Sequence, residues 1–250
     1  MKRRSRNRPQ SSPAPLRRLY TASPRAGVET LAEILSQPDT WRETARQLAA
    51  NGSLSKIQRV FSRNAPWLFV ACGSSYYLAR AVAAQWTRLL KADCTAAPPS
   101  EFLFARDETL ARTAAKQVVL ISRSGKTTEV LRLAQQLSAD DGIRTMGITC
   151  NVESDLARLC TRSVTLPWAD ERSLVMTRAF ISILLLLTQL GADFAQDTSL
   201  AAALETLPED AAVWLGANAD KIRAFGAKRS LDDFVCWVRA QITGWRRKPR

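Results

Sequence analysis

Four short apolar runs, each ending at polar or turn-forming residues, mark the middle of the chain. Buried strands typically show this pattern, and two of the runs lead into segments with helical spacing of apolar residues, 76–91 and 127–137. Strands that alternate with helices predict a parallel sheet covered by helices on both faces, which is an α/β fold. The four predicted strands are Trp67–Cys72, Gln117–Ile121, Thr145–Thr149 and Ser163–Leu166, with a short helix expected around Leu156.

Helical patterns flank this region on both sides. Residues 28–54 place apolar side chains at helical spacing, and Pro38 divides them into two helices. The longest apolar run, 180–190, is well short of the roughly 20 residues that a bilayer span requires, so it predicts a buried helix and no membrane association. We expect N-terminal helices over 27–56 and one α/β domain over 57–195.

Two turns rich in glycine and serine follow strands of the predicted sheet. They are Gly73-Ser74-Ser75, after the first strand, and Ser122-Arg123-Ser124-Gly125, after the second. Ligands of parallel sheets bind beyond the carboxyl ends of the strands, which is where both turns fall.

The second turn continues into Lys126 and Thr127 and invites comparison with a nucleotide-binding P-loop. Such a loop requires a glycine five positions before Gly125, where this chain has Leu120 inside the strand. The turn still combines a glycine, backbone N–H groups at a helix N-terminus and three hydroxyls, which suits a phosphate monoester. The alternative is that its serine and threonine only cap the helix, and the turn alone leaves both interpretations open.

The net charge of +13 lies entirely at the two ends of the chain. Residues 1–26 carry eight basic side chains and no acidic one, and residues 237–250 carry five basic side chains and no acidic one. The 210 residues between them hold 23 basic and 23 acidic side chains, so the folded body gives no reason to expect a nucleic-acid groove. Residues 1–26 are expected to form a disordered tail, with a transit peptide as the alternative.

Histidine and cysteine counts exclude further classes of function. The chain has no histidine, so it cannot by itself complete a mechanism that needs imidazole, nor most zinc sites. Its five cysteines form no C-x-x-C pair, which argues against a disulfide framework and fits a reducing cytoplasm. We expect neither a metal nor a cofactor.

Five motifs follow one another along the chain. They are Cys72-Gly-Ser-Ser75, Pro99-Ser-Glu-Phe102, Ile121-Ser-Arg-Ser-Gly-Lys-Thr-Thr128, Gly147-Ile-Thr-Cys-Asn151 and Glu171-Arg-Ser-Leu-Val-Met-Thr-Arg-Ala-Phe180. In this order they resemble the SIS, or sugar isomerase, domain family. The likeness runs from about residue 29 to residue 195 and is greatest to the isomerase half of glucosamine-6-phosphate synthase and to tagatose-6-phosphate ketose/aldose isomerases.

The resemblance implies a flavodoxin-like three-layer sandwich that binds a phosphosugar at the strand ends. By motif, the loop 122–127 would hold the phosphate, and the turn 73–75 would bind the sugar. The early residues of the segment 171–178 would line the site. The expected binding residues are Gly73, Ser74, Ser75, Ser122, Arg123, Ser124, Gly125 and Thr127, with Glu101, Leu174, Val175 and Thr177 as further lining residues.

Three positions need separate interpretation. Arg123 and Lys126 replace a glutamine and a glutamate of the aminotransferase pattern. Their charges either favour an anionic ligand or are solvated side chains at the helix end. Glu101 is favoured as a structural residue, because an acid beside small residues caps a helix as readily as it moves protons.

Isomerases of this family carry two SIS domains, and the resemblance places the catalytic base, lysine and histidine largely in the second. Residues 196–236 resemble inter-domain helices and a first strand of such a domain, at 231–236. The last 14 residues, 237–250, lack both a turn and helical spacing. Read one base earlier, their codons permit Leu-Gly-Ser-Gly, so we hypothesise a frameshift near Cys236 that truncates the protein. The rival is a natural single-domain protein with a basic tail.

These observations predict a phosphosugar-binding protein with no catalytic residue of its own. Its parental activity would be aldose–ketose isomerisation or deamination of a sugar 6-phosphate, which requires a positioned base. A sugar-phosphate-sensing regulatory module and an orphan assembly partner are the alternatives. The expected partners are a sugar phosphate and a second copy of the chain, and neither nucleic acid nor membrane.

Overall fold

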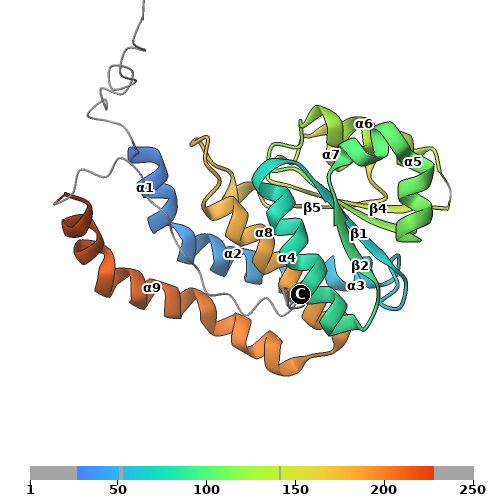
Figure 1. Cartoon of the computed structure of the whole chain (residues 1–250). Coiled ribbons are helices and arrows are strands. Elements are labelled where there is room, and N and C mark those ends of the chain that lie inside the picture. The colour runs from blue at the N-terminus through green and yellow to red at the C-terminus, as the bar shows by residue number, and fades with distance from the viewer. Residues whose placement is uncertain (1–26, 51–52, 141, 228–250) are drawn as a thin grey trace, which may run out of the picture.

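A sheet of five parallel strands forms the centre of the computed structural model, which describes residues 27–50, 53–140 and 142–227 (Figure 1). The strand order is β2-β1-β3-β4-β5, so the two strands that precede the glycine- and serine-rich turns lie side by side. The predicted α/β class with a parallel sheet is confirmed. The strands are β1 (Trp67–Ala71), β2 (Cys94–Ala97), β3 (Gln117–Ile121), β4 (Arg144–Thr149) and β5 (Arg162–Thr165).

Side chains of β1 alternate between two separate hydrophobic clusters. Trp67 and Phe69 face one cluster, and Leu68 and Val70 face the other. Every residue of β1 is buried, which is why the run reads as continuously apolar and not as alternating. The sheet is therefore the middle layer of a sandwich with helices on both sides.

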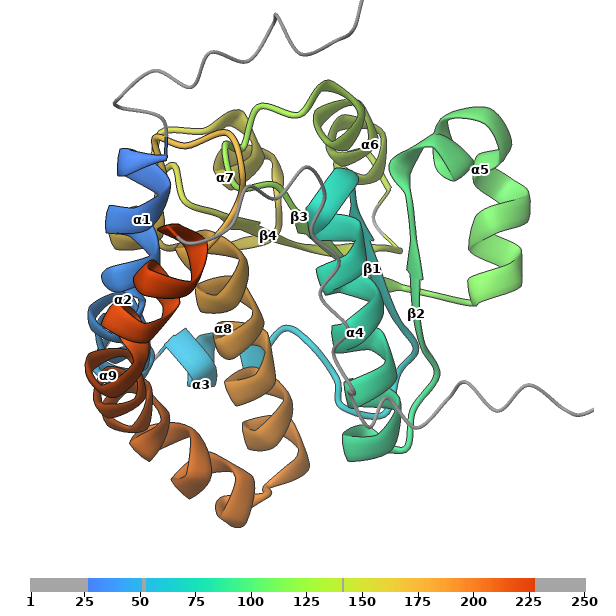
Figure 2. The same ribbon diagram turned by 60° about the vertical axis from the view of Figure 1, so that its left-hand side comes forward.

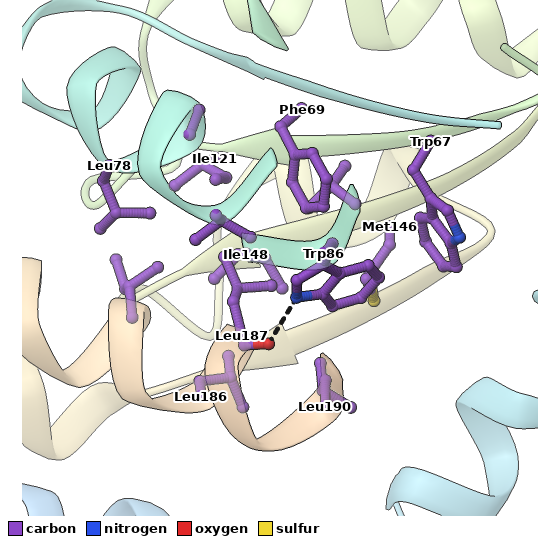
Figure 3. Packing of buried hydrophobic residues seen from close by; sticks show 14 of the residues in the cluster. Trp67, Phe69, Leu78, Trp86, Ile121, Met146, Ile148, Leu186, Leu187 and Leu190 are labelled. Carbon is purple, nitrogen blue, oxygen red and sulfur yellow. Dashed lines mark hydrogen bonds between the residues drawn. The ribbon is translucent and has the colours of Figure 1, made fainter. Parts of the chain in front are cut away.

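The first cluster lies between the sheet and helices α4 (Gly73–Leu90) and α8 (Arg178–Ala195). Figure 3 shows Trp86 of α4 beneath the sheet, where its indole N–H donates to the backbone oxygen of Leu187 at 2.8 Å. The ring of Trp86 lies edge-on to Trp67, with centroids 4.8 Å apart. An added Cβ at Gly191 would lie 2.6 Å from the indole nitrogen of Trp86, so that helix position requires glycine.

Helix α8 meets the length and composition of a membrane span, with a mean hydropathy of 1.4, and 61% of it is buried inside the fold. It packs against α4 on one side and α2 on the other. It is the core helix predicted from the apolar run 180–190.

The second cluster lies on the opposite face of the sheet, under α5 (Pro99–Thr113), α6 (Thr128–Ser138) and α7 (Asp155–Leu159). Helix α6 contributes Val130, Leu133 and Leu137 to it, and α5 contributes Phe102. Figures 1 and 2 show these helices on the side of the sheet away from α4 and α8.

Further helices pack outside α8. The N-terminal helices are α1 (Val28–Leu35), α2 (Gln37–Ala50) and α3 (Ser53–Gln58), and the short 3-10 helix η2 (Pro167–Ala169) leads toward α8. Helix α9 (Thr198–Ala227) runs along α2 and α8 and contains Pro208. The break predicted at Pro38 falls at Ser36, because proline is tolerated in the first turn of a helix, where its missing N–H has no intrahelical partner.

Strand β2 and helix α5 were not predicted from the sequence, and neither was the short helix η2. Strand β2 contains only Cys-Thr-Ala-Ala, and two of its residues are not fully buried, so it has no apolar run. Helix α5 has a non-helical residue at Ala105, which divides its pattern. The strand expected at 231–236 and the tails 1–26 and 237–250 lie outside the described residues.

Candidate functional site

The two glycine- and serine-rich turns lie next to each other at the carboxyl edge of the sheet. Strands β1 and β3 pair in parallel, with Ala71 opposite Ile121 at their ends. Neighbouring strands are about 4.8 Å apart, so the residues that follow these two positions emerge side by side. The structure thus brings together the turn 73–75 and the loop 122–127, as expected from the order of strands.

The loop 122–127 is a compact turn held by its own hydrogen bonds. The Gly125 N–H donates to the Ser122 carbonyl at 3.0 Å, and the Lys126 N–H donates to Ser124 Oγ at 3.2 Å. The side-chain oxygens of Ser122 and Thr127 are 2.8 Å apart and share a hydrogen bond. These bonds set the hydroxyls of the loop in fixed positions at the start of α6.

Thr127 occupies the N-cap position of α6, yet its side chain makes no capping hydrogen bond. It is paired with Ser122 instead, so the simple capping interpretation of this threonine does not hold. The N–H groups of the first helical turn have no intrahelical acceptor and carry the positive end of the helix dipole. The start of α6 therefore offers donors and positive potential beside two hydroxyls, which is a suitable environment for an anion.

Gly125 is required by packing as well as by its backbone. Its φ is +64°, in the left-handed region, and an added Cβ would lie 2.3 Å from Cβ of Ser154 and 2.8 Å from Oγ1 of Thr149. Ser154 caps α7 by accepting from the Ala157 N–H at 3.3 Å, so it is not free to move. The glycine thus lets the loop approach α7 and the end of β4.

The turn 73–75 forms the first turn of α4. Gly73 has a φ of +57°, with nothing within 4 Å of the position of a Cβ, so space is open above it. Ser74 is exposed and Ser75 is buried. Both hydroxyls donate to the sulfur of Met176, at 3.3 and 3.5 Å.

Residues 170–177, which we call the strap, connect η2 to α8 and make hydrogen bonds with both turns. Arg123 of the loop donates through Nη1 to the carbonyls of Ser173 at 3.1 Å and Glu171 at 3.4 Å. Its guanidinium is half-buried and is turned toward the strap, whereas Lys126 is exposed. Arg123 is therefore not a solvated side chain, because it joins the loop to the strap, and its predicted role in binding an anionic ligand stays a prediction.

Within the strap, Glu171 accepts hydrogen bonds from Thr177. Oε1 of Glu171 accepts from the Thr177 N–H at 2.6 Å and from its hydroxyl. The other oxygen of Glu171 is buried without a hydrogen-bond partner among the residues described. Leu174 and Val175, at the tip, are 93% and 64% exposed. Their predicted role in lining the site, like that of Thr177, stays a prediction.

A buried carboxylate from outside the α/β domain holds the strap from the other side. Oε1 of Glu33, in α1, accepts from the backbone N–H groups of Arg172 at 2.6 Å and Ser173 at 3.1 Å, and Oε2 accepts from the Ser173 hydroxyl. Burial would raise the pKa of Glu33, but these hydrogen bonds and the charge of Arg178 lower it below its ordinary value. Sequence reasoning missed Glu33, because nothing local marks a contact 140 residues away.

Glu101 lies in the first turn of α5, at the end of β2, and forms an ion pair with Arg112 of the same helix. This pairing is a structural contact other than the helix cap that was expected, and the predicted role of Glu101 in lining the site stays a prediction.

The described cysteines are free thiols: Cys72, Cys94, Cys150 and Cys160. Burial raises the pKa of Cys94 to about 11 and that of Cys150 and Cys160 to about 12, so these three are not thiolates at neutral pH. The described residues contain no group of three or more acidic or cysteine side chains placed to hold a metal ion.

Comparison with known proteins decides the family. The model of the SIS domain matches residues 64–192, which is just over half of the chain. The chain belongs to the SIS domain family. The matched region runs from just before β1 into α8 and contains the turn 73–75, the loop 122–127 and the strap.

Curated and solved relatives agree with this assignment. Glutamine–fructose-6-phosphate aminotransferase from Campylobacter jejuni is 31% identical over 131 residues, or 52% of this chain and 21% of the relative. Glucosamine-6-phosphate deaminase from Thermotoga maritima is 32% identical, with a TM-score of 0.57 over 72% of this chain and 54% of that one. Tagatose-6-phosphate ketose/aldose isomerase from Escherichia coli is 18% identical, with a TM-score of 0.64 over 80% and 56%. The chain spans about a fifth of the curated relatives and just over half of these solved chains.

Proposed function

We propose that this SIS domain binds a sugar phosphate across the two adjacent turns. The phosphate would lie against the loop 122–127 at the start of α6, and the sugar over the turn 73–75. The proposal agrees with the names of its relatives, which act on sugar 6-phosphates.

The observation that carries the proposal is the pairing of Ser122 with Thr127. Their oxygens lie 2.8 Å apart at a helix N-terminus where Thr127 does not cap. A phosphate oxygen is a stronger acceptor than a neutral hydroxyl, so it can take hydrogen bonds from both side chains and from the first-turn N–H groups. Gly125 allows the backbone of the loop to turn toward that position.

The parental reaction we propose is aldose–ketose isomerisation or deamination of a sugar 6-phosphate. Such a reaction moves a proton between two carbons and requires a positioned base together with an acid at the ring oxygen. The 250 residues contain no histidine, so they do not themselves supply an imidazole for either task. A sugar-phosphate-sensing module is the second candidate, and it needs binding without turnover.

We also propose that two copies of the chain associate, and that the protein acts in the cytoplasm. Apolar side chains on outer helices support the association: Val213 and Trp214 of α9 are 73% and 57% exposed, and Val28 of α1 is 57% exposed. Exposed apolar area of this kind is unfavourable in water unless a partner covers it.

Titration calorimetry with glucosamine 6-phosphate, fructose 6-phosphate and inorganic phosphate tests the site. The double variant Ser122→Ala with Thr127→Val removes both hydroxyls, and each hydrogen bond to a charged group contributes about 1.5–3 kcal/mol. We therefore expect at least a roughly tenfold loss of affinity for all three ligands. Ser138→Ala, at the far end of α6, is the matched control and should bind as the parent does. Equal affinity of the double variant and the parent would refute the assignment of the phosphate to this loop.

A further inference from the structure

The sulfur of Met176 occupies the position from which a ligand would be bound by the turn 73–75. Ser74 Oγ lies 3.3 Å and Ser75 Oγ 3.5 Å from the sulfur, and both hydroxyls donate to it. Met176 is half-buried and packs against the hydrophobic cluster beneath α4 and α8, so its side chain is held over the turn.

A serine hydroxyl has one hydrogen to donate. While Ser74 and Ser75 donate to Met176, neither can donate to a sugar oxygen. The thioether is a weak acceptor, so a ligand oxygen can displace it, but only by breaking the two existing bonds. The strength of the acceptor at residue 176 should therefore set how readily the turn binds a ligand.

We propose that Met176 is an internal competitor for the hydroxyls of Ser74 and Ser75, and that its oxidation by a peroxide weakens ligand binding. This proposal rests on the proposed function of the turn 73–75. It makes the site sensitive to the redox state of one side chain.

The oxidation step is a simple oxygen transfer. A sulfur lone pair attacks one oxygen of hydrogen peroxide, so an S–O bond forms as the O–O bond breaks. The second oxygen leaves as hydroxide. It then takes the proton from the oxygen now bound to sulfur, which gives water and the sulfoxide. Sulfur is oxidised by two electrons and the peroxide is reduced. The product is a polar sulfoxide, whose oxygen is a far stronger acceptor for the two serine hydroxyls than the thioether is.

Met176 is the accessible methionine of the described residues. Met146, in β4, is fully buried between the sheet and its helices, and Met1 lies outside the described part. Peroxide should therefore modify Met176 well before Met146.

The test compares three forms of the protein that differ at residue 176, by titration calorimetry with glucosamine 6-phosphate. Met176→Leu keeps a similar side-chain volume but has no hydrogen-bond acceptor at residue 176. The parent has a weak acceptor there, and the peroxide-treated parent has a strong acceptor. Peptide mass spectrometry verifies the sulfoxide at residue 176. We expect affinity to fall in that order. The leucine variant should bind roughly threefold more tightly than the parent, and the sulfoxide roughly tenfold more weakly.

Three controls isolate the effect. Inorganic phosphate, which reaches only the loop 122–127, should bind all three forms equally. Peroxide should not weaken binding to Met176→Leu, whereas a loss there would point to another group such as Cys72 and overturn the proposal. Methionine sulfoxide reductase should restore the affinity of the oxidised parent.

The outcomes separate this inference from the proposed function. If the untreated parent binds no sugar phosphate, the proposed function fails and the inference falls with it. If the parent binds but the leucine variant and the sulfoxide bind equally well or in the reverse order, Met176 is no competitor and the proposed function stands.

Discussion

Replacing Gly125 with alanine is expected to destabilise the SIS domain through two separable costs. The first is conformational, because a left-handed backbone costs a residue with a Cβ about 1–2 kcal/mol, and φ at Gly125 is +64°. The second is steric, because the added Cβ would lie 2.3 Å from Cβ of Ser154. Overpacking of this kind costs about 1–3 kcal/mol, which gives a total of about 2–5 kcal/mol.

Gly73→Ala is the matched control for the conformational cost alone. Its φ is +57°, but nothing lies within 4 Å of the added Cβ, so about 1–2 kcal/mol is expected. Urea unfolding of both variants and the parent, followed by tryptophan fluorescence, gives the two free energies of unfolding. Adding Ser154→Gly to Gly125→Ala should recover much of the steric cost. The reasoning is refuted if Gly125→Ala is no less stable than Gly73→Ala.

Two further predictions concern the strap. The lowered pKa of Glu33 means that its carboxylate stabilises the fold above about pH 4.5, the ordinary value, and that this contribution is lost as the pH falls through the folded-state pKa. Glu33→Gln should therefore cost about 1–3 kcal/mol at pH 7, and the difference from the parent should shrink in acid unfolding curves below pH 4.5. Arg123→Ala removes the Nη1 group that donates to the carbonyls of Glu171 and Ser173, so amide hydrogen exchange in residues 171–177 should accelerate several-fold. Unchanged exchange would mean that Arg123 does not hold the strap.

Strands β1 and β3 were predictable because their burial is complete on both faces. All five residues of β1 and of β3 are buried, and such strands produce apolar runs that are visible without any tertiary information. Strand β2 lies at the edge of the sheet, where alanine and a partly exposed threonine are sufficient, and the sequence therefore carried no signal for it.

The placement of the two turns could be predicted from the sequence, but the hydrogen-bond partners of their side chains could not. Parallel strands place successive turns at one edge, so the meeting of residues 73–75 with 122–127 followed from the strand pattern. The direction of the Arg123 side chain did not, because carbonyls of the strap, about 50 residues further along, determine it. Local sequence encodes which turn a residue occupies, whereas the partner of a long side chain depends on the packed fold.

Glu33 changes where the working unit of this protein begins. The region matched by the family starts at residue 64, and α1 lies 29 residues before it, yet a carboxylate of α1 holds the strap that carries Met176. A recombinant domain cut to the matched region would keep the sheet, the turn 73–75 and the loop 122–127 while leaving the N–H groups of Arg172 and Ser173 without their acceptor. A recombinant version of this SIS domain should therefore begin before residue 28. If a shorter version fails to bind ligand, that result does not refute the proposed binding site.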